Sequence, residues 1–236
     1  MVFFNLPFFF KTLVRLISRI PVTLGITAGS FVLGLTLALI LAAVQIYKVP
    51  VARRLAQLYI SFMRGTPILI QLLIFNLLIP QLIWRLTGFN AGRYWPPITF
   101  VIMAYAFNIA AFLSEILRAS ITGVGAGQQE AAYSVGLSEL QSLWHVILPQ
   151  AFRISLPGMA NNLSGLLKDT SLAFSAAGIL DVMGMVSANA AATFRELEGY
   201  VGAALIFFAL CLLLERGMHL LSVRLNRGIA VLQRGA

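Results

Sequence analysis

Charge and cysteine are both scarce in this 236-residue chain. Only 11% of its residues are charged, whereas soluble domains average about 25%, so charged groups cannot cover a water-facing surface of this size. The single cysteine, Cys211, permits no internal disulfide and has no Cys or His neighbours that would suggest a metal site. No GxxxxGK[ST] phosphate loop and no Ser, Cys and His constellation occur, so we assign no catalytic residue and no metal.

Apolar residues take the place of the missing charge. They make up 59% of the chain, the mean hydropathy is +0.89, and they run in blocks long enough to cross a bilayer, which takes roughly 20 residues. The net charge of +9 could indicate nucleic-acid binding, but the basic residues bracket the apolar blocks, as in loops held beside a membrane. We therefore expect an all-α integral membrane protein of about five transmembrane helices, with the lipid bilayer and no nucleic acid as a partner.

The first twenty residues predict an interfacial amphipathic helix, which lies at the membrane surface. Lys11, Arg15 and Arg19 recur every four residues, and the opposite side carries mainly the apolar residues Phe9, Leu13, Leu16 and Ile20. A cleaved signal peptide is the alternative, but the charge-free run from Ile20 to Tyr47 exceeds the roughly 7 to 15 residues of a signal-peptide apolar region. We assign this run to the first membrane span.

Four further apolar blocks predict the remaining spans. They lie within Leu55–Trp84, at Ile98–Leu117, from Ile154 onward, and from Gly199 with a charge-free part that ends at Leu214. The stretch 178–194 is expected to be a short helix or loop at the far face. The predicted organisation is thus an amphipathic segment at 1–20, a transmembrane domain at 21–222 with a long polar loop at 119–153, and a basic cytoplasmic tail at 223–236.

The distribution of basic residues predicts the orientation. Five spans put the termini on opposite faces, and the two faces carry nine and six basic residues: Lys48, Arg53, Arg54, Arg118, Arg153, Arg216, Arg224, Arg227 and Arg234 against Lys11, Arg15, Arg19, Arg85, Arg93 and Arg195. The positive-inside rule therefore places the polar loop and the carboxyl terminus in the cytoplasm. The basic amino-terminal helix opposes this assignment.

A pattern of seven residues stands out in the polar loop. It consists of a Glu-Ala-Ala triplet, a glycine four residues later and a Val-x-Leu-Pro ending: Glu130, Ala131, Ala132, Gly136, Val146, Leu148 and Pro149. Small alanines let a helix seat closely in a groove, and a glycine allows a turn that a Cβ atom would oppose. Proline stops a helix. The pattern predicts two short helices joined at Gly136, the second of which ends at Pro149. An amphipathic surface helix with an incidental glycine would explain any four of these residues, but not all seven.

This loop resembles the EAA loop of bacterial ATP-binding-cassette importer permeases, in which it is the coupling helix that docks into the ATPase. Val146 departs from the isoleucine usual in that family. The segments 62–72 and 156–174 are similar to the second and fourth spans of the polar amino-acid branch. The resemblance implies a permease of the bacterial cytoplasmic (inner) membrane that moves a polar amino acid. It also implies a second permease, two ATPase subunits that bind ATP and Mg²⁺, and an extracytoplasmic binding protein.

Two groups of residues are candidates for the substrate path. Pro67 and Gly65 break the second span, and broken helices at membrane depth usually line cavities; Arg64 could instead anchor the span at the interface. In the fourth span, amides can donate to a carboxylate and accept from an ammonium. The candidates are Arg64, Gly65, Thr66, Pro67, Asn161, Asn162, Lys168 and Asp169.

Structural pairing is the other interpretation of some charges in the spans. Lys168 and Asp169 point about 100° apart on a helix and could pair with neighbouring spans or lie at the outer headgroup boundary. Glu115 and Arg118, at i and i+3, are expected to pair with each other.

Two other functions compete with an importer permease. An ion- or proton-coupled secondary transporter could use Lys168, Asp169 and Asp181 as a relay, but such carriers often contain paired repeats and none is evident. A membrane-embedded enzyme would need clustered His, Cys or carboxylate groups.

Overall fold

The protein is a bundle of long helices. The computed structural model describes the backbone of residues 4–233 and the side chains of residues 4–225, and every regular element in this part of the chain is helical. The α-helices are α1 (Leu6–Ile17), α2 (Ile20–Ile46), α3 (Ala52–Gly65), α4 (Ile68–Thr87), α5 (Ala91–Tyr94), α6 (Pro97–Thr122), α7 (Ala126–Ser134), α8 (Glu139–Ser142), α9 (Leu148–Asp169), α10 (Ala173–Ala177), α11 (Val182–Thr193) and α12 (Leu197–Gln233). A π-helical turn at Leu143–Ile147 precedes α9, and a 3-10 turn at Thr170–Leu172 follows it.

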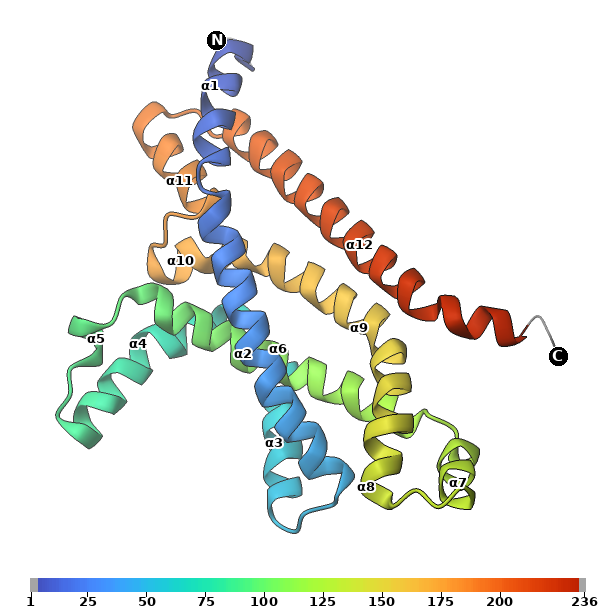
Figure 1. The fold of residues 1–236 in the computed structure, drawn as a ribbon. Coiled ribbons are helices and arrows are strands. Elements are labelled where there is room, and N and C mark those ends of the chain that lie inside the picture. The colour runs from blue at the N-terminus through green and yellow to red at the C-terminus, as the bar shows by residue number, and fades with distance from the viewer. Residues whose placement is uncertain (1–3, 234–236) are drawn as a thin grey trace.

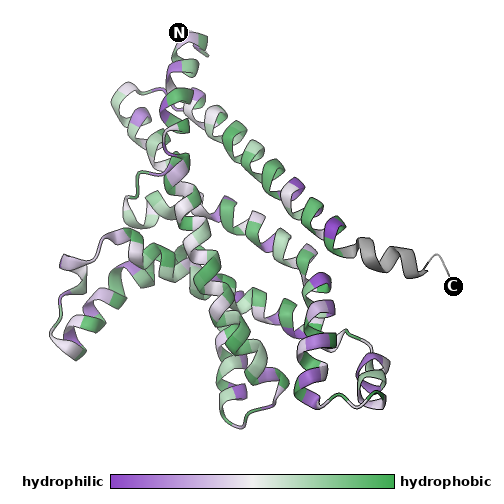
Figure 2. Ribbon diagram, viewed as in Figure 1, coloured by the Kyte–Doolittle hydropathy of each residue, from purple (hydrophilic) through white to green (hydrophobic). Residues whose placement is uncertain are grey.

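The expected number of membrane crossings is confirmed. Four stretches are long and apolar enough to span a bilayer: Leu6–Ile46, Ile68–Thr87, Pro97–Thr122 and Leu197–Leu225. A fifth is a bent pair, Glu139–Ala177 with Val182–Thr193, which meet at 48°. Hydrophobic residues predominate along these helices, as the colouring of Figure 2 shows. The stretch 178–194, expected as a short helix or loop, contains helix α11.

The predicted interruption of the second span is present, and it divides the span into two helices. The expected span within Leu55–Trp84 is divided into α3 and α4 between Gly65 and Ile68. Only α4 is apolar and long enough to cross by itself. Pro67 has no N–H to donate, and Thr66 adopts an extended backbone, so the chain leaves one helix and begins another rather than bending within one.

The start of the fourth crossing was predicted wrongly. Pro149 was expected to stop a helix before a span that begins near Ile154, but helical structure continues from Glu139 through Pro149 to Asp169. Pro149 is the second residue of α9, directly after the π-helical turn, and the first turn of a helix tolerates proline. The Gln150 side chain donates to the Val146 carbonyl oxygen at 3.0 Å, which satisfies a backbone acceptor in this turn.

Helices α2 and α6 form the closest pair in the bundle. A Cβ atom on Gly34 would collide with the Ile109 side chain and lie 2.9 Å from the Ala106 carbonyl oxygen, so the two backbones approach closely there. Ser30, one turn earlier in α2, donates to the Ile102 carbonyl oxygen at 3.3 Å. Because both contacts advance in the same direction along the two helices, α2 and α6 are parallel.

The two ends of the bundle carry different elements. Figure 1 shows α1, α11 and the start of α12 together at one end, with α3, α7 and α8 toward the other. Helix α1 packs on α11 and α12 through the face that carries Phe9 and Leu16. Helix α12 continues past residue 222 into the expected tail. The side chains of Arg227 and Arg234, used for the orientation, lie outside the described residues.

Candidate functional site: two polar cavities and the loop between the third and fourth spans

A buried glutamine organises the break between α3 and α4. Gln71 is 2% exposed, and its amide nitrogen lies 2.9 Å from the Met63 carbonyl oxygen and 3.1 Å from that of Thr66. These are carbonyls that the interrupted helix leaves without a regular partner. The Gln71 side-chain oxygen accepts a hydrogen bond of 2.9 Å from Asn108 on α6. The break is therefore fixed to the third span by polar contacts.

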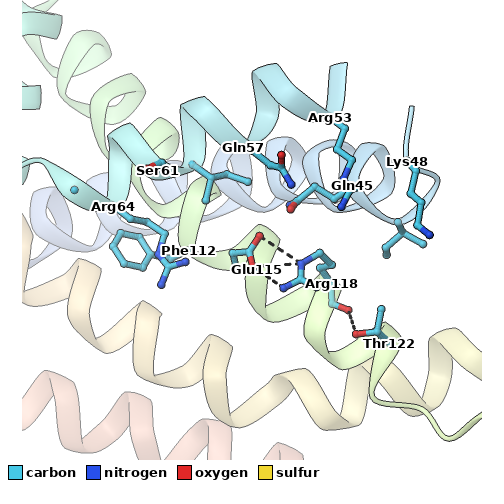
Figure 3. A pocket seen from close by; sticks show the side chains of 13 residues that line it. Gln45, Lys48, Arg53, Gln57, Ser61, Arg64, Phe112, Glu115, Arg118 and Thr122 are labelled. Atoms are coloured by element: carbon cyan, nitrogen blue, oxygen red, sulfur yellow. Dashed lines mark hydrogen bonds and ion pairs between the residues drawn. The ribbon is translucent and has the colours of Figure 1, made fainter. Parts of the chain in front are cut away.

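A cavity of about 890 Å³ opens beside this break. Its lining comes from the end of α2 and the loop after it, the length of α3, and the second half of α6: Gln45, Ile46, Lys48, Arg53, Gln57, Ile60, Ser61, Arg64, Gly65, Phe112, Glu115, Arg118 and Thr122. Figure 3 shows Arg64 next to the ring of Phe112, and the guanidinium carbon lies 5.5 Å from the ring centroid. Arg118 and Glu115 form the expected ion pair, with 2.8 Å between nitrogen and oxygen. The cavity wall thus carries both charge signs and two amides, those of Gln45 and Gln57.

A second cavity of about 270 Å³ lies between α6 and α9. Its lining joins three of the predicted α9 residues to the third span: Asn108, Ile109, Phe112, Asn161, Asn162, Gly165, Leu166 and Asp169. Asn162 donates to the Gly158 carbonyl oxygen at 3.0 Å, which fixes its amide, whereas the Asn161 side chain is exposed. Because Phe112 lines both cavities, it stands between the broken span and the amides of α9.

The structure separates the predicted path residues into groups. Arg64 and Gly65 line the larger cavity, and Asn161, Asn162 and Asp169 line the smaller one. Thr66 and Pro67 line neither of these cavities. The Thr66 hydroxyl accepts a hydrogen bond of 2.8 Å from the Gln71 amide nitrogen at the break between α3 and α4.

Lys168 points elsewhere. It lines a cavity of about 380 Å³ against α12, with Phe207, Cys211 and Glu215 among its neighbours. The expected divergence of Lys168 and Asp169 on the helix is therefore confirmed.

Sequence reasoning did not identify Gln71, Asn108 or Gln45 as members of this site. All three are uncharged polar residues inside or at the end of apolar helices. An uncharged amide at membrane depth must find a hydrogen-bond partner or line a polar cavity, and that rule could have indicated them.

The loop between the third and fourth spans has the predicted turn. Helix α7 is followed, after Val135, by a left-handed residue, Gly136, whose φ is +84°. The Leu137 N–H bonds the Ala132 carbonyl oxygen at 3.1 Å, and the Gly136 N–H bonds that of Tyr133 at 3.0 Å. This pair of hydrogen bonds is the Schellman motif, which requires the conformation that glycine adopts without strain.

A capped helix follows this turn. Ser138 caps α8 and exchanges hydrogen bonds with Gln141. Two helices joined at a glycine are thus confirmed, although α8 continues into the π-helical turn. Of the seven motif residues, Ala132 is buried and Val146 and Leu148 are half-buried. The others, Glu130, Ala131, Gly136 and Pro149, are exposed. Most of the motif is therefore available at the surface of the loop.

Together, the five crossings define a multi-pass membrane protein, and polar cavities lie beside its broken second span. The chain belongs to the family of binding-protein-dependent transport system inner membrane components, whose pattern matches residues 34–227. It is therefore a permease, a transport subunit that works with an ATPase and a substrate-binding component. This membership excludes the secondary-transporter alternative.

Known permeases are similar to this chain over most of its length. A probable amino-acid ABC transporter permease protein, PatM of Vibrio harveyi, is 33% identical over 95% of this chain and 97% of its own. The L-cystine transport system permease protein TcyL of Bacillus subtilis is 40% identical over 85% of this chain and 82% of its own. In the crystal structure of an amino acid ABC transporter with histidines, a chain 29% identical to this one matches with a TM-score of 0.82, over 94% of this chain and 99% of that one.

Proposed function

We propose that this permease carries a polar amino acid into a bacterial cell along a path that joins the two cavities meeting at Phe112. The observation that carries the proposal is the shared lining: Arg64 and Gly65 border one cavity, and Asn161, Asn162 and Asp169 border the other. Relatives named for L-cystine, arginine and octopine support the substrate class.

The chemistry of the lining suits such a substrate. An amino acid presents a carboxylate, which needs donors, and an ammonium, which needs acceptors. Arg64 and the two asparagines supply donors, while Asp169 and the amide oxygens supply acceptors. Thr66 and Pro67 contribute by keeping the second span broken. We omit Lys168 from the path, because it faces α12 across a different cavity.

The loop residues couple this path to a separate ATPase. Glu130, Ala131, Ala132 and Gly136 belong to the first helix of the loop and its turn, and Val146, Leu148 and Pro149 to the second. The exposed face of α7 enters a groove of the ATPase, and the turn at Gly136 sets the angle between the two helices. ATP and Mg²⁺ are bound by that partner, and this chain contributes no cofactor ligand.

The working complex contains a second permease, identical or homologous, two ATPase subunits and an extracytoplasmic binding protein. It lies in the bacterial cytoplasmic (inner) membrane. The loop between α6 and α9 and the carboxyl terminus face the cytoplasm. The predominance of basic residues around that loop and the last span supports this orientation.

Transport by the reconstituted complex tests the proposal. The permease, its ATPase and its binding protein are placed in vesicles and offered a panel of labelled amino acids. We expect uptake of at least one polar amino acid that requires both ATP and the binding protein. Uptake driven by an ion gradient without ATP, or no uptake of any amino acid, would contradict it.

A further inference from the structure

The larger cavity forms the last part of the proposed path. Along α6, the lining of the smaller cavity comes first, from Asn108 to Phe112, and that of the larger cavity follows, from Phe112 to Thr122. At 1.5 Å per residue the larger cavity extends roughly 15 Å along this helix, about half the thickness of a bilayer core. Our orientation places the end of α6 at the cytoplasm, so an imported solute crosses the larger cavity last.

Basic side chains dominate the wall of this cavity. Four of them and one carboxylate give the lining a net charge of +3: Lys48, Arg53, Arg64 and Arg118 against Glu115. They come from three elements, the loop after α2 and the helices α3 and α6. Figure 3 shows Arg64 and Lys48 toward opposite ends of the cavity, with Glu115 and Arg118 between them. The positive charge is therefore distributed along the passage.

Three of the four positive charges are uncompensated. The Glu115 carboxylate pairs with Arg118 at 2.8 Å and neutralises it. In the part of the chain that the structure describes, no carboxylate forms an ion pair with Lys48, Arg53 or Arg64. The Arg64 guanidinium lies over the Phe112 ring, a contact that positions it without removing its charge. The wall thus presents net positive charge to a passing solute.

The smaller cavity has the opposite sign. Asp169 is the one charged residue that the structure places in its lining, beside the amides of Asn108, Asn161 and Asn162. The ammonium that every amino acid carries on its Cα atom can be matched by this carboxylate. What differs between amino acids is the side chain, so the charge of the larger cavity acts on the part of the solute that varies.

We propose that the larger cavity selects amino acids by charge, admitting those with neutral or acidic side chains and disfavouring those with basic ones. A second positive charge on the solute meets three uncompensated cations, and the single carboxylate of the wall is already paired. Charges in a narrow passage between helices interact more strongly than in bulk water. The inference rests on the proposed function and narrows its substrate class.

An anionic lipid headgroup is the other ligand that such a cavity could hold. The position of Arg64 favours the solute. It lies 11 residues after Arg53 in α3, or about 16 Å along the helix, beside the break in the second span. A headgroup at the membrane surface could meet Lys48 and Arg53, but it would not reach Arg64.

Amino-acid binding to the purified permease–ATPase complex tests the proposal. The binding protein is left out, so its own selectivity does not enter, and labelled acidic, neutral and basic amino acids are compared. We expect the tightest acidic or neutral amino acid to bind at least about tenfold more tightly than the tightest basic one. That ratio should fall in 1 M salt, where screening limits the reach of a charge to about 3 Å.

Glutamine substitutions on α3 assign the selectivity to residues. Arg64→Gln and Arg53→Gln should each lower the ratio about three- to tenfold, whereas Arg64→Lys, which keeps the charge, should retain it. Arg54→Gln is the matched control, because Arg54 is an exposed neighbour on the same helix that does not line the cavity. If loss of the Arg64 ring contact prevents assembly, Arg53→Gln provides the test alone.

Three results would overturn the proposal. The first is a basic amino acid that binds as tightly as any acidic or neutral one. The second is an unchanged ratio in the glutamine variants, or an equal change in Arg54→Gln; loss of bound anionic lipid without a change in ratio would assign the charges to the membrane. The third is no amino-acid binding to a complex that transports one. Failure of the proposed function is distinguishable, because the complete complex would then show no ATP-driven uptake of any amino acid.

Discussion

Asn108 on α6 donates a hydrogen bond of 2.9 Å to Gln71 on α4, the residue that bonds the backbone at the break in the second span. The Gln71 amide satisfies the carbonyls of Met63 and Thr66 at the same time. A helix interruption that would be costly at membrane depth is thereby made stable. The same asparagine lines the smaller cavity, so the contact that holds the break open also contributes to the proposed path.

Replacing Gln71 with leucine should destabilise the protein. Gln71→Leu leaves buried carbonyl oxygens without donors, at a cost of about 1 to 3 kcal/mol in the free energy of unfolding. Thermal unfolding of the purified permease in detergent measures the loss. Gln81→Leu, at an exposed position of the same helix, is the control and should change stability little. Equal stability of Gln71→Leu and the unmodified protein would show that the amide is dispensable.

Replacing Gly136 with valine should uncouple transport from ATP. A β-branched residue in the left-handed region costs about 1 to 2 kcal/mol and distorts the turn between α7 and α8. We expect normal membrane insertion but no ATP-driven uptake, measured in vesicles with the ATPase and the binding protein. Gly136→Asn should retain most uptake, since asparagine tolerates this conformation. Full transport by Gly136→Val would remove the loop from the coupling mechanism.

Alanine at Asn161 or Asn162 should weaken transport of the substrate. Loss of a hydrogen bond to a charged group costs about 1.5 to 3 kcal/mol, or roughly a ten- to hundredfold rise in KM. The KM for each amino acid of a labelled panel provides the measurement. Lys168→Ala, which alters the cavity against α12 instead, should change the KM far less. If both asparagine variants kept the original KM across the panel, these side chains would not line the path.

Cysteine labelling should separate the two faces of the membrane. In a Cys211→Ser background, Arg93→Cys lies in the short helix α5 and Gln141→Cys in α8, and both positions are exposed. A membrane-impermeant thiol reagent added outside cells should label the first, and the second only after the membrane is opened. Labelling of both from outside would reverse the proposed orientation of the loop.

A valine at Gly34 should weaken the bundle. Its side chain would collide with Ile109 and crowd the Ala106 carbonyl, and overpacking of this kind costs about 1 to 3 kcal/mol. Gly25→Val is the matched control on the same helix, because a Cβ atom there has no heavy atom within 4 Å. Thermal unfolding of the two variants should therefore differ. Equal midpoints would mean that α2 and α6 separate at little cost.

Local patterns in the sequence determined much of this protein. Runs of apolar residues predict the number of crossings, because the thickness of a bilayer sets the length of a helix that spans it. The turn at Gly136 and the Glu115–Arg118 pair also followed from residues close in the chain. The divergence of Lys168 and Asp169 follows from the rotation of 100° per residue.

Tertiary structure decided what depends on residues distant in the chain. Gly34 is critical only because α6 lies against it, and nothing within α2 distinguishes it from Gly25. Pro149 was expected to end a helix, but it lies in the first turn of α9, directly after the π-helical turn, where proline is tolerated. Arg64, Phe112 and Asn161 come from three different helices, so their assembly around adjoining cavities depends on how those helices pack. Periodicity assigns a residue to a face of its own helix, but packing selects the partner that the face meets.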